Sequence, residues 1–242
     1  MNKFDAPESS RRAVLKNTAA LSVLALTGIS GFMVPHVTYA ASLTKHSMTP
    51  DDVIKSFKVG NTRFREGKMQ QHDFVAQKIS SQEGQFPAAV ILSCIDSCAP
   101  AEILLDTGIG ETFNARVAGN VQNEDILGSM EFACAAAGAK VVLVMGHTAC
   151  GAVACAIDNV ELGNLTGLLN KIKPAVEKTV YEGDRTGKNM AFVDAVAKTN
   201  VALTVEHIRE HSPILKKLEQ EGKIKIVGSM YHLVGGEVEF LS

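Results

Sequence analysis

The chain has 242 residues, of which 46% are hydrophobic and 21% charged, so it holds enough apolar material for one large domain with a sizeable core. The formal net charge is −2; residues 1–40 hold four of the 24 basic and two of the 26 acidic side chains, so the remainder carries a net charge of −4. This acidic balance, with no basic stripe and no tryptophan, argues against nucleic acid as a main partner.

The first 40 residues have the pattern of an export signal. The segment Ser9–Lys16, "SSRRAVLK", resembles the twin-arginine export signature, and the apolar run Ala19–Val34 that follows is interrupted by Thr, Ser and Gly. Small residues precede Ala41 at a plausible cleavage point. We therefore expect an export signal over 1–40, a periplasmic domain over 41–242 in a bacterium, and no stable membrane span after cleavage. The alternative is a membrane anchor that is never cleaved.

The predicted elements begin with two helices. Thr49 is a suitable cap for a helix with Pro50 at its first position, and a second helix is expected within Gln70–Gln82. The continuous apolar run Ala88–Ser93 then predicts a strand that is buried on both faces.

Strands and helices alternate through the rest of the chain, which predicts an α/β domain with a largely parallel sheet. The expected strands are Glu111–Ala118, Lys140–His147, and two within Lys223–Leu241 joined near Gly235–Gly236. The expected helices are Asn123–Ala139, Cys150–Ile157, Leu165–Lys178 and Phe192–His211.

The chain contains five cysteines, and this odd, unevenly spaced set is a poor disulfide framework. We expect Cys134 to lie in a helix core and Cys155 to face away from Cys150 in the same helix.

Cys94 follows one predicted buried strand, while His147 and Cys150 end another. Open α/β sheets place their sites at the carboxyl ends of strands. Two thiolates and an imidazole suit Zn²⁺, and three protein ligands leave a fourth position open. The spacing alone leaves buried structural cysteines as an alternative.

Three motifs resemble those of the β-class carbonic anhydrases: "SCIDS" (Ser93–Ser97), "RVAGN" (Arg116–Asn120) and "GHTACGA" (Gly146–Ala152). The resemblance runs from about Thr49 to the C-terminus. It implies a mostly parallel β-sheet with an antiparallel edge strand, flanked by α-helices. It also implies one Zn²⁺ per subunit in a homodimer or homotetramer, with Cys94, His147 and Cys150 as ligands.

The resemblance further implies reversible hydration of CO₂ to bicarbonate and a proton. Asp96 would orient the attacking water or close onto the metal as a fourth ligand. Gln85 fits the position of the family's active-site glutamine and would donate a hydrogen bond to substrate or bicarbonate. Gly119 and Gly151 would permit close backbone approach at the site, with Gly151 near the substrate.

Position 98 departs from the family, which has an arginine there to hold the aspartate away from the metal. Cys98 cannot make two parallel N–H bonds to a carboxylate. Asp96 would then close onto zinc, Cys98 would itself become a ligand, or Arg116 would replace the missing cation. Cys98 could also simply pack as a small side chain or form a disulfide with Cys94.

Two other functions stay open: a noncatalytic zinc-binding member of the fold, favoured by the missing arginine, and a hydrolase of carbon disulfide or carbonyl sulfide. In some relatives, the arginine at the position of Arg116 forms an inhibitory bicarbonate site with a tryptophan. Here Ile91 stands in place of that tryptophan, so we expect no such site. Asp106 matches an acidic stretch of the family without an assigned role.

Overall fold

A computed structural model describes residues 48–82 and 84–241 of the chain. The expected export signal over 1–40 and its cleavage point lie outside the described residues. Within those residues the strands form one sheet in the order β2-β1-β3-β4-β5. The strand bounds are β1 (Ala89–Ser93), β2 (Thr112–Arg116), β3 (Val141–His147), β4 (Lys225–Tyr231) and β5 (Val238–Phe240).

The sheet is parallel except at one edge. β1 pairs with β2 on one side and β3 on the other, and β3 pairs with β4, all in parallel. β5 runs antiparallel to β4, and the connection between them passes through Gly235 and Gly236, both with positive φ. These observations confirm the predicted fold class of a mostly parallel sheet with an antiparallel edge strand.

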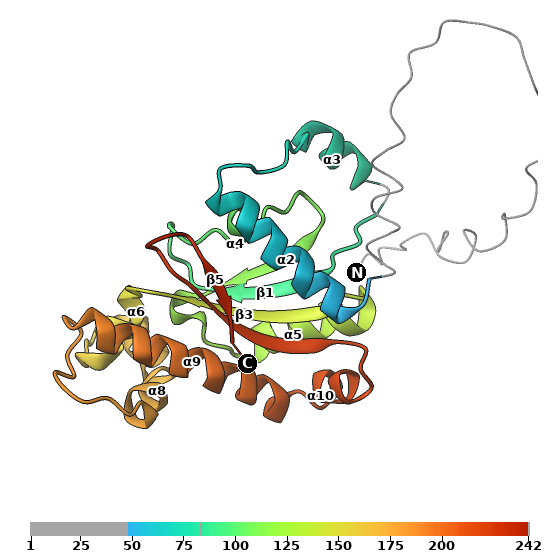
Figure 1. The fold of residues 1–242 in the computed structure, drawn as a ribbon. Helices are drawn as coiled ribbons and strands as arrows, with labels where there is room; N and C mark the ends of the chain where they lie inside the picture. The colour runs from blue at the N-terminus through green and yellow to red at the C-terminus, as the bar shows by residue number, and fades with distance from the viewer. Residues whose placement is uncertain (1–47, 83, 242) are drawn as a thin grey trace, which may run out of the picture. The chain divides into compact units, whose positions relative to one another are not determined.

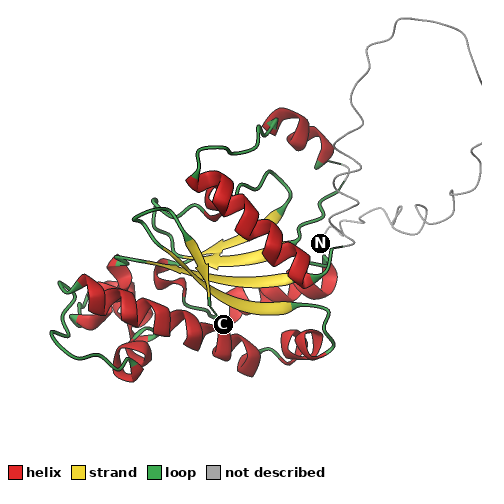
Figure 2. Ribbon diagram, viewed as in Figure 1, coloured by secondary structure: helices red, strands yellow, loops and turns green. Residues whose placement is uncertain are grey.

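Helices cover both faces of this sheet, as Figures 1 and 2 show. The helices that begin before β3 are α2 (Pro50–Arg65), α3 (Phe74–Ser80), α4 (Ala101–Leu104) and α5 (Glu124–Glu131). The later helices are α6 (Gly151–Ile157), α7 (Gly163–Asn170), α8 (Lys173–Lys178), α9 (Met190–His211) and α10 (Pro213–Gln220).

Alternate residues of the central strands point into two separate hydrophobic cores. Ile91 and Leu143 pack with α2 and α4 on one face. Leu92 and Val144 pack with α5 to α10 on the other face. Every residue of β1 and β3 is buried, which explains why the sequence of these strands is almost continuously apolar.

The first described helix begins where the sequence predicts. The Thr49 side chain accepts a bond from the Asp52 backbone N–H, and the Asp52 carboxylate accepts one from the Thr49 backbone N–H. This reciprocal capping box satisfies N–H groups that a helix terminus otherwise leaves open. Acidic residues in the first turn and basic residues in the last turn also complement the helix dipole.

Two helical predictions need correction. A single helix over Leu165–Lys178 was wrong, because the structure has α7 and α8 separated at Lys171–Ile172. Pro174 lies in the first turn of α8, where its missing N–H costs no helical hydrogen bond. The sequence analysis also missed α10, although Ser212 and Pro213 form a typical helix start, in which the Ser212 hydroxyl accepts from the Leu215 N–H.

A polar cluster around the buried carboxylate of Asp106, which we call the Asp106 cluster, lies near the amino ends of β1 and β2. It comprises Arg63, Gln70, His72 and Asp106. The Asp106 carboxylate accepts bonds from Arg63 Nε, from the Gln70 backbone N–H and from His72 Nε2. The cluster therefore ties the end of α2 and the segment after it to the loop that follows α4.

None of the helices in the described part of the chain combines the length and apolar character needed to span a membrane.

Candidate metal centre

The predicted metal ligands come from two loops at the same edge of the sheet. Cys94 directly follows β1, while His147 is the last residue of β3 and Cys150 directly precedes α6. Because β1 and β3 are adjacent and parallel, with Ser93 opposite Met145, their carboxyl ends bring the two loops together.

Four side chains converge at this edge. One ligand atom from each of Cys94, Asp96, His147 and Cys150 lies within 4.8 Å of all the others. The Cys94 and Cys150 sulfurs are 4.0 Å apart, and Asp96 Oδ2 lies 3.8 Å from the Cys94 sulfur. The two cysteines and His147 are at most 2% exposed, whereas Asp96 is only partly buried. The site is thus a buried pocket with its carboxylate on the solvent side.

The His147 ring is oriented for metal binding. Its Nδ1 lies 2.9 Å from the Thr148 carbonyl oxygen, so this nitrogen carries the proton and donates. Its Nε2 lies 3.2 Å from Asp96 Oδ2, but the two atoms are not aligned as a hydrogen bond, and the buried Nε2 has no hydrogen-bond partner. A buried nitrogen with a free lone pair facing two sulfurs is what a metal ligand requires.

The Cys94 and Cys150 sulfurs lie within hydrogen-bond distance of each other. The hydrogen bond between them lowers the pKa of Cys94 and raises the pKa of Cys150. Burial lowers the pKa of His147, but its interaction with the nearby Cys94 raises it by more. Negative charge on the Cys94 sulfur favours a cation among these donors.

Backbone and arginine contacts hold the Cys94 loop in place. The Gly119 N–H donates to Cys94 Sγ over 3.3 Å. Arg116, at the end of β2, donates from Nε to the Cys94 carbonyl and from its guanidinium to the Asp96 carbonyl. Arg116 therefore grips the main chain of the loop, and these contacts leave the Asp96 carboxylate without the bidentate partner that the sequence analysis considered.

The His147–Cys150 loop is held from two sides. Thr148 bonds through its backbone N–H to the Tyr231 carbonyl, and its hydroxyl accepts from the Leu233 N–H. The Ala149 N–H donates to Asp194 on α9 over 2.7 Å. Ala149 has a φ of 53°, so this bond helps to hold a backbone conformation that alanine rarely adopts.

Other predicted residues lie outside the cluster. Cys98 is exposed and is not among the grouped ligand atoms, and no bond links Gln85, also exposed, to the site within the described part of the chain. Gly151 is exposed, and a Cβ there would meet open space, so crowding does not require glycine at that position.

Cys134 is buried, and burial raises the pKa of its thiol to about 12, which agrees with the predicted core role. Cys155 packs at the edge of the larger core.

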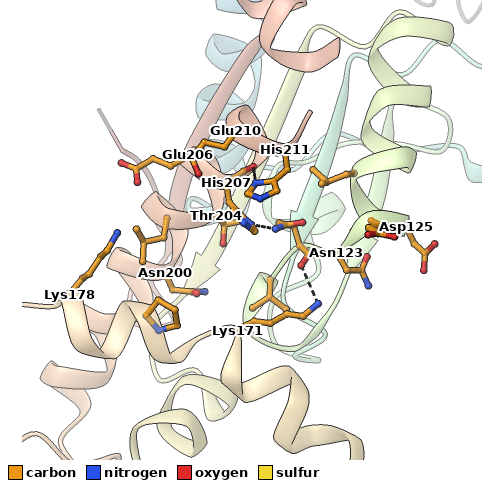
Figure 3. Close-up of a pocket in the computed structure, with 16 residues that line it drawn as sticks. Asn123, Asp125, Lys171, Lys178, Asn200, Thr204, Glu206, His207, Glu210 and His211 are labelled. Atoms are coloured by element: carbon orange, nitrogen blue, oxygen red, sulfur yellow. Dashed lines mark hydrogen bonds between the residues drawn. The ribbon is translucent and has the colours of Figure 1, made fainter. Parts of the chain in front are cut away.

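A cavity of about 900 Å³ lies on α9, away from the four clustered residues. Its wall includes Asn123, Lys171, Asn200, Thr204 and His207, shown in Figure 3. The sequence analysis singled out none of these residues as functional, because they belong to three segments that only the folded chain brings together.

The clustered donors fit a zinc ion. Two thiolates and one imidazole nitrogen are ligands that Zn²⁺ prefers, and a carboxylate is an acceptable fourth. The unpartnered Nε2 of His147 and the 4.0 Å approach of the two buried sulfurs are the two observations that favour a metal over a merely packed core.

Comparisons with known proteins agree with this geometry. Residues 89–238 match the family described as carbonic anhydrase. The chain is 33% identical to a carbonic anhydrase of Mycolicibacterium smegmatis over 78% of this chain and 91% of that one. The chain belongs to the β-carbonic anhydrase family. Carbonic anhydrase 2 of Mycobacterium tuberculosis is 34% identical over 75% of this chain and 88% of that one.

Solved structures of β-carbonic anhydrases share the fold. The β-carbonic anhydrase CafA of Aspergillus fumigatus has a TM-score of 0.62 at 24% identity, over 85% of this chain and 91% of that one. Two tetrameric β-carbonic anhydrases of Sordaria macrospora are represented by a chain with a TM-score of 0.61 at 20% identity, over 86% of this chain and 98% of that one.

Proposed function

We propose that this member of the family is a zinc-dependent carbonic anhydrase that hydrates CO₂ reversibly to bicarbonate and a proton. The observation that carries the proposal is the buried group of two sulfurs and one unpartnered imidazole nitrogen at the carboxyl edge of the sheet. When bound, zinc supplies the Lewis acidity that makes a water molecule nucleophilic near neutral pH.

The chain's own groups set the conditions for this chemistry. Cys94, Cys150 and His147 would hold the metal, and the Thr148 carbonyl keeps the proton of His147 on Nδ1, which leaves Nε2 free to bind. Asp96 stands on the exposed side of the group, where its carboxylate would accept a hydrogen bond from the attacking water.

Asp96 also supports the proposal that activity is weak. Its carboxylate oxygen lies within 4.8 Å of the other three donor atoms, so Asp96 can take the fourth position that the reaction needs open. Cys98 is exposed and carries no positive charge to draw the carboxylate away. This geometry favours a resting site closed by Asp96, and it keeps a noncatalytic zinc-binding protein as the second candidate.

The test is stopped-flow CO₂ hydration by zinc-loaded protein, with Cys98→Arg beside the wild-type chain. We expect measurable hydration by the wild type and faster hydration by the arginine variant. No hydration by either protein, at one zinc per chain, would favour the noncatalytic candidate.

We also propose that residues 1–40 direct export through the twin-arginine pathway to the periplasm. The support is the motif Ser9–Lys16 and the interrupted apolar run after it. Replacing Arg11 and Arg12 by lysine should keep the protein in the cytoplasm of a bacterial host, measured by cell fractionation. Equal periplasmic amounts of both forms would contradict this.

We further propose that the chain assembles as a homodimer or homotetramer. Tetrameric assembly is stated for the relatives from Sordaria macrospora, which share the fold. Sedimentation of the purified protein would measure its mass, and a monomer at micromolar concentration would contradict this.

A further inference from the structure

The N–H group that points at Cys94 belongs to a residue with a constrained backbone. Gly119 has a φ of 67° and a ψ of 18° within the short 3₁₀ turn Ala118–Asn120. A Cβ at this position would lie 2.5 Å from Ile172 Cδ1. Both the positive φ and the lack of room for a Cβ therefore favour glycine here. In this conformation the Gly119 N–H lies 3.3 Å from the Cys94 sulfur.

A side chain from a distant helix fixes the other side of Gly119. Asn200, on α9, donates from Nδ2 to the Gly119 carbonyl oxygen over 2.8 Å. Asn200 is only 3% exposed and lies beside the fully buried Val196 and Val201. A buried amide is costly unless it is hydrogen-bonded, so this contact accounts for the polar residue at this point of the helix.

We infer that Asn200 is a positioning residue for the metal ligand Cys94. It holds the Gly119 carbonyl, and thereby the turn that aims the Gly119 N–H at the sulfur. An N–H bond to a thiolate withdraws negative charge from the sulfur, so the metal retains more of its own positive charge. This inference rests on the zinc site proposed above.

The competing explanation is that Asn200 only satisfies a carbonyl group in the core. A purely structural role would lower stability without changing the electronic state of the metal. The two roles therefore separate in a spectroscopic measurement on the bound metal rather than in activity alone.

The chain offers a matched control. Thr204 lies one turn further along α9, is also buried, and lines the same cavity as Asn200 (Figure 3). Thr204→Val removes a buried polar group of this helix without touching Gly119.

The experiment compares wild type, Asn200→Leu, Asn200→Ala and Thr204→Val. Zinc affinity is measured by competition with a chromophoric chelator, and the thiolate-to-metal charge-transfer band is recorded after Co²⁺ substitution. We expect both Asn200 variants to bind zinc about tenfold more weakly, which is the loss of affinity typical for groups that support a metal ligand. We also expect both variants to shift the charge-transfer band. Thr204→Val should stay within about twofold of wild type.

Asn200→Leu keeps most of the side-chain volume, whereas Asn200→Ala leaves a cavity, so one variant carries the test if the other does not fold. An unchanged band and zinc affinity in a folded Asn200 variant would overturn the inference. The inference would also be overturned if zinc affinity fell in proportion to the loss of stability in all three variants, Thr204→Val included. Neither readout requires CO₂ hydration, so failure here is distinct from failure of the proposed enzyme activity.

Discussion

Two polar clusters, each built around a buried polar side chain, lie at opposite ends of the parallel strands, and they differ in how their hydrogen bonds are completed. In the Asp106 cluster, the carboxylate accepts bonds from Arg63, Gln70 and His72, all within the chain. In the metal centre, His147 Nε2 has no partner, and the two sulfurs that lie 4.0 Å apart have at most one hydrogen bond between them. A cluster that satisfies its own groups stabilises the fold, whereas one that leaves buried donor atoms free is built for a ligand.

The largest expected effect comes from removing a metal-centre sulfur. Cys150→Ser should reduce bound zinc from about one ion per chain to less than about a tenth, and CO₂ hydration should fall to background, because hydroxyl is a poor zinc ligand. Metal analysis after gel filtration measures this. Cys155→Ser, five residues later and within α6, is the matched control and should bind zinc normally. Full zinc content in Cys150→Ser would contradict the role of Cys150 as a zinc ligand.

In the Asp106 cluster the largest effect should be on stability. Asp106→Asn leaves Arg63 and His72 without their anion and should lower the free energy of unfolding by about 3 kcal/mol, as for other broken buried ion pairs. Urea unfolding of the zinc-loaded protein measures this.

The control for that variant is Asp51→Asn, which removes an exposed pair with Lys225 and should cost less than about 1 kcal/mol. Zinc content should not change in either variant. Loss of zinc from folded Asp106→Asn would show that the two clusters are coupled and would contradict the division of roles.

Cys98→Arg should change activity without changing the fold. An arginine at this exposed position would draw the Asp96 carboxylate from the metal and raise the rate of CO₂ hydration about tenfold, which corresponds to one charge-assisted bond. Cys98→Ala is the control, because it removes the thiol and adds no charge. Equal rates for wild type and Cys98→Arg would contradict the idea that Asp96 closes the site.

The smallest expected effect is a pH dependence of stability. Burial raises the pKa of Asp106, but the bonds from Arg63, Gln70 and His72 lower it by more, so its pKa in the folded chain is below the ordinary value. Its stabilising contribution is therefore complete above the unfolded pKa of about 3.9 and is lost as the pH falls through the lower folded pKa. The stability difference between wild type and Asp106→Asn should be constant from about pH 7 to 5 and shrink below about pH 4. A difference that shrinks between pH 7 and 5 would contradict this assignment.

The sequence predicted which side chains gather at the metal centre, because strand ends and the three family-like motifs marked them. Cys94 and His147 each stand at the end of a continuous apolar run, and parallel strands bring such ends to one edge. The fold class followed from the alternation of predicted strands and helices along the chain.

Asn200 and the Asp106 cluster were out of reach from sequence because their partners are distant. Asn200 bonds a residue 81 positions away, and Asp106 bonds residues 34 to 43 positions away. These positions carry no motif and do not stand at the ends of neighbouring strands, so only the packed sheet and helices bring them together. The break between α7 and α8 was missed for a different reason, since Pro174 was present but was not read as a helix start.

The separation of Cys94 and Cys150 by 56 positions also bears on the order of folding. The two sulfurs meet only after β1 has paired with β3, and such nonlocal parallel pairing is slow because the intervening chain must first be closed into a loop. A complete set of zinc donors therefore does not exist in the early, locally structured chain. Zinc uptake follows sheet formation, so the rate of metal capture during refolding reports the step at which the centre of the sheet assembles.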